Sequence, residues 1–62
     1  MYTLTRARDG RKVEFYHEQR SGQTVYIIRE GAASQDSVTH DKEAVDAFRE
    51  GLLRDGFIQA PF

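Results

Sequence analysis

Residues able to do acid-base or nucleophilic chemistry are scattered along this 62-residue chain rather than grouped. They include two histidines and three serines, which are His17, His40, Ser21, Ser34 and Ser37. A catalytic serine needs a base within hydrogen-bond reach and commonly sits in a tight strand-to-helix turn, a context that no serine here has. His17 follows an alternating run, where a packed histidine is more common than a general base. We therefore expect no catalytic residue and no enzymatic activity.

Residue spacing does not indicate a metal or a cofactor either. His40 has Asp41 beside it, but a zinc site takes three or four ligands at matched spacing, and the chain contains no cysteine. The five glycines form no phosphate-cradling loop of the kind that binds nucleotide cofactors. We expect the protein to work without a metal ion and without a cofactor.

The length and composition bound the class of protein. A chain this short forms one domain, residues 1–62, and buries only about 60% of the surface that its unfolded form exposes. It has no cysteine for a disulfide, and no segment approaches the roughly 20 apolar residues that span a bilayer. Its beginning, MYTLTRARDG, lacks the apolar stretch of a signal peptide. These features predict a cytoplasmic protein with no membrane partner.

The charges divide the chain into a mildly basic and an acidic half. Six basic residues accompany four acidic ones up to Glu30, and three basic residues accompany six acidic ones from Gly31 onward, for a net charge of −1. Proteins that bind nucleic acid present enough lysine and arginine to neutralise several phosphates. The charge distribution therefore disfavours nucleic acid as a partner, without excluding it.

Two turn signals divide the first half of the chain into three strands. Asp9-Gly10 lies between two alternating runs and predicts a two-residue type I′ turn, which pairs Leu4 with Phe15. Ser21-Gly22 predicts a second turn, which pairs Phe15 with Ile28. In these registers one face of the sheet carries Tyr2, Leu4, Val13, Phe15, Tyr26 and Ile28. We expect this face to be covered by a helix.

The covering helix is predicted within DKEAVDAFREGLLRDGF, residues 41–57. Asp41 or Thr39 is the expected N-cap, and Gly56 suits the position just after the helix. The apolar residues at helical spacing, which we expect to contact the sheet, are Ala44, Val45, Phe48, Leu52 and Leu53.

Two segments complete the predicted fold. Residues 31–40 have turn composition and admit either a loop or one short strand around Val38. Residues 58–62 predict a short extended tail, because Pro61 disfavours helix just before it. The expected fold class is α+β: a three-stranded antiparallel meander, with a fourth short strand if Val38 lies in one, and one C-terminal helix packed on one face.

The strand face turned away from that helix carries apolar side chains of its own. Tyr16 lies opposite Ile27 in the predicted register, with Val25 beside them, and the pair of Glu14 and Arg29 borders this cluster. Exposed aromatic and β-branched residues are common in strands without any function. The functional interpretation is a surface for a protein partner or for self-association, with Tyr16 as aromatic anchor and the charges as rim. The predicted partner-binding residues are therefore Tyr16, Val25, Ile27, Glu14 and Arg29. The outer edges of the two outer strands are also open to pairing.

The second half of the chain carries a pattern of single residues and pairs. It consists of Arg29-Glu30, Val38, Ala47-Phe48, Gly51 and Gly56-Phe57. With KVEFY standing in place of a Val-Glu strand, residues 25–57 resemble the small actinobacterial regulators related to BldB. Val45 replaces a helix tryptophan of that family, and MYTLTRARDG lacks its tryptophan- and serine-rich start. The resemblance covers about half the chain and implies a non-enzymatic regulator that acts through protein contacts, often beside a helix-turn-helix partner.

The pattern of three strands and a helix is also similar to DNA-binding modules of APETALA2-type plant factors, integrase arm domains and WGR domains. These imply nucleic acid at the free sheet face, where Glu14 and Glu18 repel phosphates, and the WGR tryptophan is absent. We therefore expect a small regulatory protein-interaction module that acts through the helix-free face or an open sheet edge, with a homodimer as one form. Nucleic-acid binding through the free face is the alternative.

Overall fold

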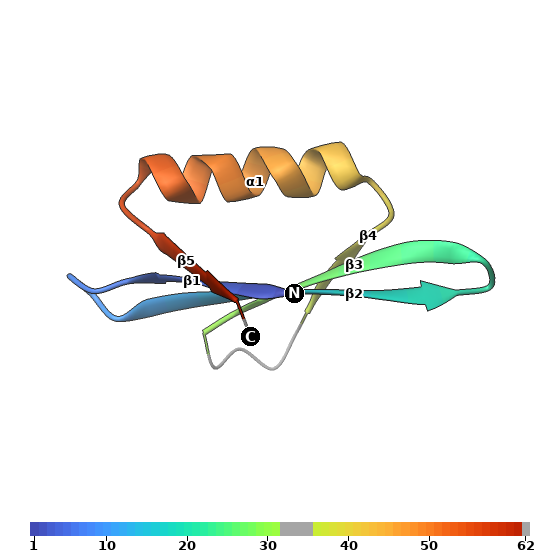
Figure 1. Cartoon of the computed structure of the whole chain (residues 1–62), viewed down its shortest axis with the longest axis horizontal. Coiled ribbons are helices and arrows are strands. Elements are labelled where there is room, and N and C mark those ends of the chain that lie inside the picture. The colour runs from blue at the N-terminus through green and yellow to red at the C-terminus, as the bar shows by residue number, and fades with distance from the viewer. Residues whose placement is uncertain (32–35, 62) are drawn as a thin grey trace.

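A computed structural model describes residues 1–31 and 36–61 as one antiparallel sheet with a helix across one face (Figure 1). The elements are β1 (Tyr2–Arg6), β2 (Arg11–Arg20), β3 (Gln23–Glu30), β4 (Ser37–Thr39), α1 (Lys42–Arg54) and β5 (Ile58–Pro61). The sheet has five strands in the order β4-β3-β2-β1-β5. The α+β class with one helix is as predicted, but the strand number is five rather than three or four.

The hairpin of β2 and β3 has the predicted register, with Phe15 opposite Ile28 and Tyr16 opposite Ile27. Ser21 and Gly22 both have positive φ, 52° and 78°, as a two-residue type I′ turn requires. Such a short turn leaves little freedom in how the two strands align. The Ser21-Gly22 turn therefore determines the register of β2 and β3.

The hairpin of β1 and β2 differs from the prediction by two residues. Arg6 pairs with Arg11, and Tyr2 rather than Leu4 lies opposite Phe15. Gly10 has a φ of 70°, but Asp9 is not in the left-handed region, so the type I′ turn does not form there. The chain instead closes a wider loop, in which the Gly10 N–H donates to the Arg6 carbonyl at 2.9 Å. A slip of two residues leaves every side chain on its predicted face.

Two short strands extend the sheet beyond the predicted meander. The alternative left open for residues 31–40 is decided by β4, which pairs with β3 and places Val38 opposite Ile27. The expected tail is a strand over its described part, because β5 runs along β1 from Ile58 to Pro61. The outer edges of β1 and β3 that we expected to be open are thus covered along these stretches. Proline is tolerated at Pro61 because β5 is an edge strand.

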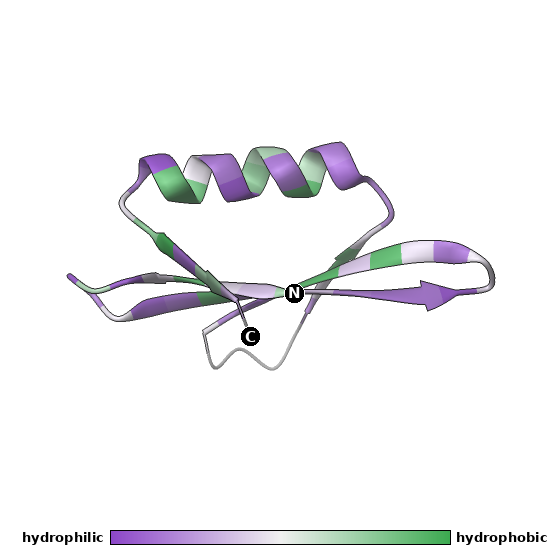
Figure 2. Ribbon diagram, in the orientation of Figure 1, coloured by the Kyte–Doolittle hydropathy of each residue, from purple (hydrophilic) through white to green (hydrophobic). Residues whose placement is uncertain are grey.

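The core lies between α1 and the sheet and consists of Leu4, Val13, Phe15, Val45, Leu52 and Phe57. Asp41, one of the two expected caps, accepts hydrogen bonds from the N–H groups of Glu43 and Ala44. After the helix, Gly56 takes a φ of 92°, and Phe57 turns back into the core. Figure 2 shows apolar segments recurring along α1 between polar ones.

The predicted inward stripe of α1 is wrong for Ala44, whereas Phe48 contacts the sheet at Phe15 but remains partly exposed. Phe48 is 42% exposed, with its ring centre 6.0 Å from that of Phe15, and Ala44 is exposed. Val45 and Leu52, two helical turns apart, are the helix residues buried against the sheet. Phe48 lies to one side of the line that joins them. Among the described residues, no helix is long and apolar enough to cross a membrane.

Candidate functional site

Three apolar side chains cross the helix-free face of the sheet in one line. Tyr16 on β2 lies opposite Ile27 on β3, and Ile27 lies opposite Val38 on β4, so all three point to the same side. Val38 is 55% exposed, and Tyr16 and Ile27 are half-buried. We call these three residues the apolar row. The structure thus brings together two of the predicted site residues and adds Val38.

Sequence reasoning missed Val38 as a site residue, although the signal was present. It is the one sizeable apolar side chain in the segment 31–40. A strand centred on it, paired to the open edge of β3, puts it beside Ile27. Only the tertiary pairing of β4 establishes that neighbourhood.

Val25 behaves differently from the apolar row. It lies opposite Glu18 on the same helix-free face, yet it is only 2% exposed and does not belong to the core under α1. A side chain this buried offers almost no surface to a partner. It lies two residues from Ile27 along β3, on the same side of the strand, and is not itself an exposed contact residue.

The charged residues of the predicted site are tied to the apolar row by specific contacts. The Tyr16 hydroxyl donates a hydrogen bond of 2.6 Å to Glu14 Oε2, which raises the pKa of Tyr16 above its usual value. The Arg29 guanidinium lies 5.7 Å from the centre of the Tyr16 ring. Glu14 and Arg29 are opposite each other as predicted, but Arg29 forms its ion pair with Asp36.

Asp36 thereby joins the border of the site. Arg29 donates through Nε and Nη2 to the two Asp36 oxygens, at 2.9 and 3.1 Å. This forked geometry is the stronger kind of arginine–carboxylate contact, and it holds the pKa of Asp36 below its ordinary value. Tyr16 is thus held at its hydroxyl by Glu14 and over its ring by Arg29, which limits its rotamer freedom before any partner arrives.

A further exposed apolar side chain of this face, in β5, stands apart from the apolar row. Ile58 on β5 is 69% exposed and lies opposite Thr5 of β1. Strand β1 and the polar pair of Thr5 and Lys12 separate it from the apolar row. It therefore does not enlarge the row into a continuous patch.

Within the described residues, the side chains considered for acid-base chemistry lie on different elements, with His17 in β2 and Ser37 in β4. His17 and His40 are both exposed, on β2 and just before α1, and Ser34 lies outside the described residues. Within residues 1–31 and 36–61 there is no group of three or more His, Asp or Glu side chains that could hold a metal ion.

A separate depression lies on the helix side, next to the far part of the β2–β3 hairpin. Its volume is about 650 Å³, and its lining includes Tyr2, Phe15, His17, Gln19, Tyr26 and Arg49. The Arg49 guanidinium lies 6.0 Å from the centre of the Tyr2 ring. The depression is wide open, and the titratable side chains around it have no nucleophile–base pairing among the described contacts.

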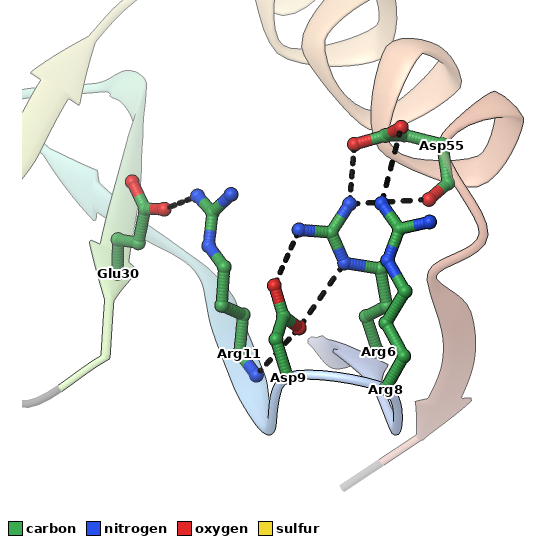
Figure 3. Close-up of polar contacts among 6 residues, drawn as sticks. All are labelled: Arg6, Arg8, Asp9, Arg11, Glu30 and Asp55. Carbon is green, nitrogen blue, oxygen red and sulfur yellow. Dashed lines mark hydrogen bonds and ion pairs between the residues drawn. The ribbon is translucent and has the colours of Figure 1, made fainter.

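The basic residues of the chain are mostly engaged in ion pairs with acidic neighbours. Figure 3 shows such contacts around the β1–β2 loop, where Arg6, Arg8 and Arg11 meet Asp9, Asp55 and Glu30. A guanidinium that already pairs with a carboxylate has less to gain from a phosphate.

Compared with protein-family models, with curated proteins and with solved structures, the chain has no significant match.

Proposed function

We propose that this protein is a small, non-enzymatic protein-interaction module that binds its partner through the helix-free face of its sheet. The observation that carries the proposal is the apolar row: three neighbouring apolar side chains on three strands of a face that no described element covers. Tyrosine and isoleucine of this kind, surrounded by charge, resemble the centre and rim of small interfaces.

The fixed position of Tyr16 supports its role as the anchor. Contacts from Glu14 and Arg29 hold the ring before binding, so less side-chain entropy is lost when a partner packs on it. The row is short, and an interface confined to it falls below the area of a stable complex. We therefore expect a transient, regulatory contact rather than a permanent one.

The regulatory part of the proposal has a second support in the sequence. The pattern of Arg29-Glu30, Val38 and Ala47-Phe48 resembles regulators related to BldB, which act through protein contacts. Val38, one of the positions of that pattern, is also a member of the apolar row. We propose the same mode of action here, inside the cell and without a cofactor.

The test is to replace Ile27 with aspartate, which places a charge in the middle of the row. Immobilised wild-type protein and the Ile27→Asp variant are compared for the partners they retain from the native cell, with binding to a recovered partner then measured by titration. Hot-spot residues contribute about 2 kcal/mol or more, so we expect affinity to fall at least ~30-fold.

The matched control is Thr5→Asp, which adds the same charge to an exposed position of the same face, away from the row. It should retain the partner with wild-type affinity, and circular dichroism should show both variants folded. Equal retention of the same proteins by wild type and Ile27→Asp overturns the proposal. So does binding only to DNA or RNA with an affinity that falls steeply with salt, which is the behaviour of the nucleic-acid alternative.

A further inference from the structure

The far part of strand β2 extends beyond its neighbour β1. Strand β1 begins at Tyr2, opposite Phe15, so Tyr16–Arg20 of β2 continue past its end. On the other side β2 remains paired with β3 as far as Arg20 opposite Gln23. Figure 1 shows this hairpin projecting beyond the N-terminal end of α1. The projecting residues His17, Glu18, Gln19 and Arg20 are all exposed.

The direction of the backbone groups along this edge follows from one hydrogen bond. The Gly31 N–H donates to the Lys12 carbonyl at 2.8 Å, so Lys12 and every second residue after it turn their N–H and C=O toward β3. The residues between them turn theirs toward the β1 side. Among these, His17 and Gln19 lie beyond β1, and no strand in the described part of the chain pairs with them.

An unpaired strand edge of this kind is a template for another strand. The depression on the helix side borders the same edge, since His17 and Gln19 line it, which leaves room for a strand to approach. We infer that a second copy of this chain occupies the edge, and that the two β2 strands pair antiparallel about a two-fold axis at Gln19.

The two-fold symmetry restricts the register of this pairing. An antiparallel pair of identical strands has its axis at a residue that faces its own copy, so the centre falls on one of the projecting residues. A centre at His17 places the second copy at Phe15, where Tyr2 already pairs. Centres at Glu18 or Arg20 bring like charges face to face, which is destabilising.

The register centred on Gln19 places charges of opposite sign opposite each other. It places Glu18 of each copy opposite Arg20 of the other, so that both cross-strand neighbours of Gln19 are ion pairs. Within one chain Glu18 and Arg20 already form an ion pair, and the Gln19 amide donates to the Thr24 hydroxyl at 2.8 Å. An edge with charges of one sign would repel its own copy. This edge carries the negative Glu18 and the positive Arg20, so an antiparallel copy of the same strand places opposite charges face to face.

The dimer goes beyond the proposed function because it leaves the apolar row uncovered. A two-fold axis perpendicular to the sheet puts both helices on one face and both apolar rows on the other. The pair of molecules then presents two copies of the row side by side, and a two-fold symmetric partner contacts both. Avidity offsets the small size of a single row.

The first test measures mass in solution by sedimentation equilibrium over a wide range of concentration. Wild-type protein should approach twice the mass of the 62-residue chain as concentration rises. Glu18→Arg and Arg20→Glu each place like charges opposite one another and should lower dimer affinity at least tenfold. The double variant, which exchanges the two charges, should recover it. Lys12→Glu makes the same change from positive to negative as Arg20→Glu, but on the part of β2 that is paired with β1. It should dimerise as wild type does.

The second test uses the absence of cysteine from the chain. A Gln19→Cys variant has one thiol, and at the two-fold axis the two Cα atoms lie about 5.5 Å apart, within disulfide range. Mild oxidation should give a covalent dimer, whereas Thr5→Cys should remain largely monomeric under the same conditions. This readout holds even if a charge variant loses its fold.

A wild-type monomer at the highest concentration overturns the inference, as does failure of the charge exchange to restore the dimer, or equal cross-linking of both cysteine variants. The Ile27→Asp variant separates the two proposals, because it should lose the partner and keep the dimer. If a charge variant no longer dimerises but its monomer binds the partner as tightly as the wild-type monomer does, the substitution has removed the dimer and left the apolar row intact.

Discussion

At the scale of single residues, Arg6 is the one charged side chain buried in the described part of the structure, at 8% exposure. Its guanidinium lies 4.8 Å from the centre of the Phe57 ring and donates to Asp9 and Asp55 (Figure 3). A buried cation is tolerated only when its donors are satisfied. Arg6 meets that condition by joining the β1–β2 loop to the end of α1.

The acid sensitivity of the fold should depend on Asp9. Its hydrogen bonds from Arg6 lower the pKa of Asp9 from 3.8 to about 2. Because the folded pKa is depressed, this contribution to stability is complete above pH 3.8 and is lost as the pH falls toward 2. Asp9→Asn should therefore melt at a lower temperature than wild type at neutral pH, and the difference should shrink between about pH 4 and pH 2.

Thermal melts followed by circular dichroism across that range provide the measurement. Glu43→Gln, at an exposed position in the first turn of α1, is the control and should change the melting temperature little at any pH. A difference between wild type and Asp9→Asn that stays constant down to pH 2 contradicts the role assigned to the Arg6 contact.

At the scale of elements, the helix contacts the sheet along a narrower line than its apolar stripe indicates. Val45 and Leu52 are buried, and the residues between them lie on opposite flanks: Phe48 on one, and Arg49, which donates to Gln59 of β5, on the other. Gly51 has open space where a side chain would stand, so no close approach within the described chain explains it. The flank with Phe48 contributes only part of its area to the core.

The cost of removing an aromatic ring should follow this arrangement. Phe15→Ala deletes a buried ring, which is 3% exposed, and should cost about 3–5 kcal/mol, which is most of the stability that so small a domain has. Phe48→Ala should cost clearly less and leave a cooperative transition. Urea unfolding of both variants decides the matter: a Phe48→Ala protein that is unfolded in buffer would show that the flank belongs to the core.

At the scale of the whole molecule, the chain is elongated, with principal extents of 40, 23 and 18 Å. The core under α1 occupies the middle, and the β2–β3 hairpin projects from it without a helix above. Stability is therefore expected to be uneven, because the side chains of the projecting part, apart from Val25, are exposed or half-buried.

Hydrogen exchange should reveal this gradient. The amide of Phe15, in the core, should exchange only through global unfolding. The amides of Glu18 and Arg20, in the β2–β3 ladder but beyond the helix, should exchange faster through local opening in dilute solution. The amide of Gln19 should become protected as concentration rises and the dimer forms. Uniform protection of all four in dilute solution contradicts the uneven stability.

How far each feature could be predicted depends on the range of the interaction behind it. The period of two in β2 and β3 and the Ser21-Gly22 turn are local, so the faces, this register and the pair of Tyr16 and Ile27 follow from the sequence. The Asp9-Gly10 turn fails because Arg6, through contacts with Asp9 and distant Asp55, favours a wider loop. The burial of Val25 and the ion pair of Arg29 with Asp36 likewise depend on neighbours that no local pattern identifies.

The sequence alone determined the α+β class, the capped helix and which side chains face it, because alternation, helical period, turn residues and caps act within a few residues of one another. Only the tertiary structure decided that β4 and β5 complete the sheet, that Val38 extends the row of Tyr16 and Ile27, that Phe48 lies on a flank, and that β1 stops short of the far half of β2. These are pairings and packings between segments far apart in the chain. These pairings depend on which sheet edge and which face remain free once the local strands and the helix have formed. A strand of three residues such as β4 is also too short to show an alternating pattern in the sequence.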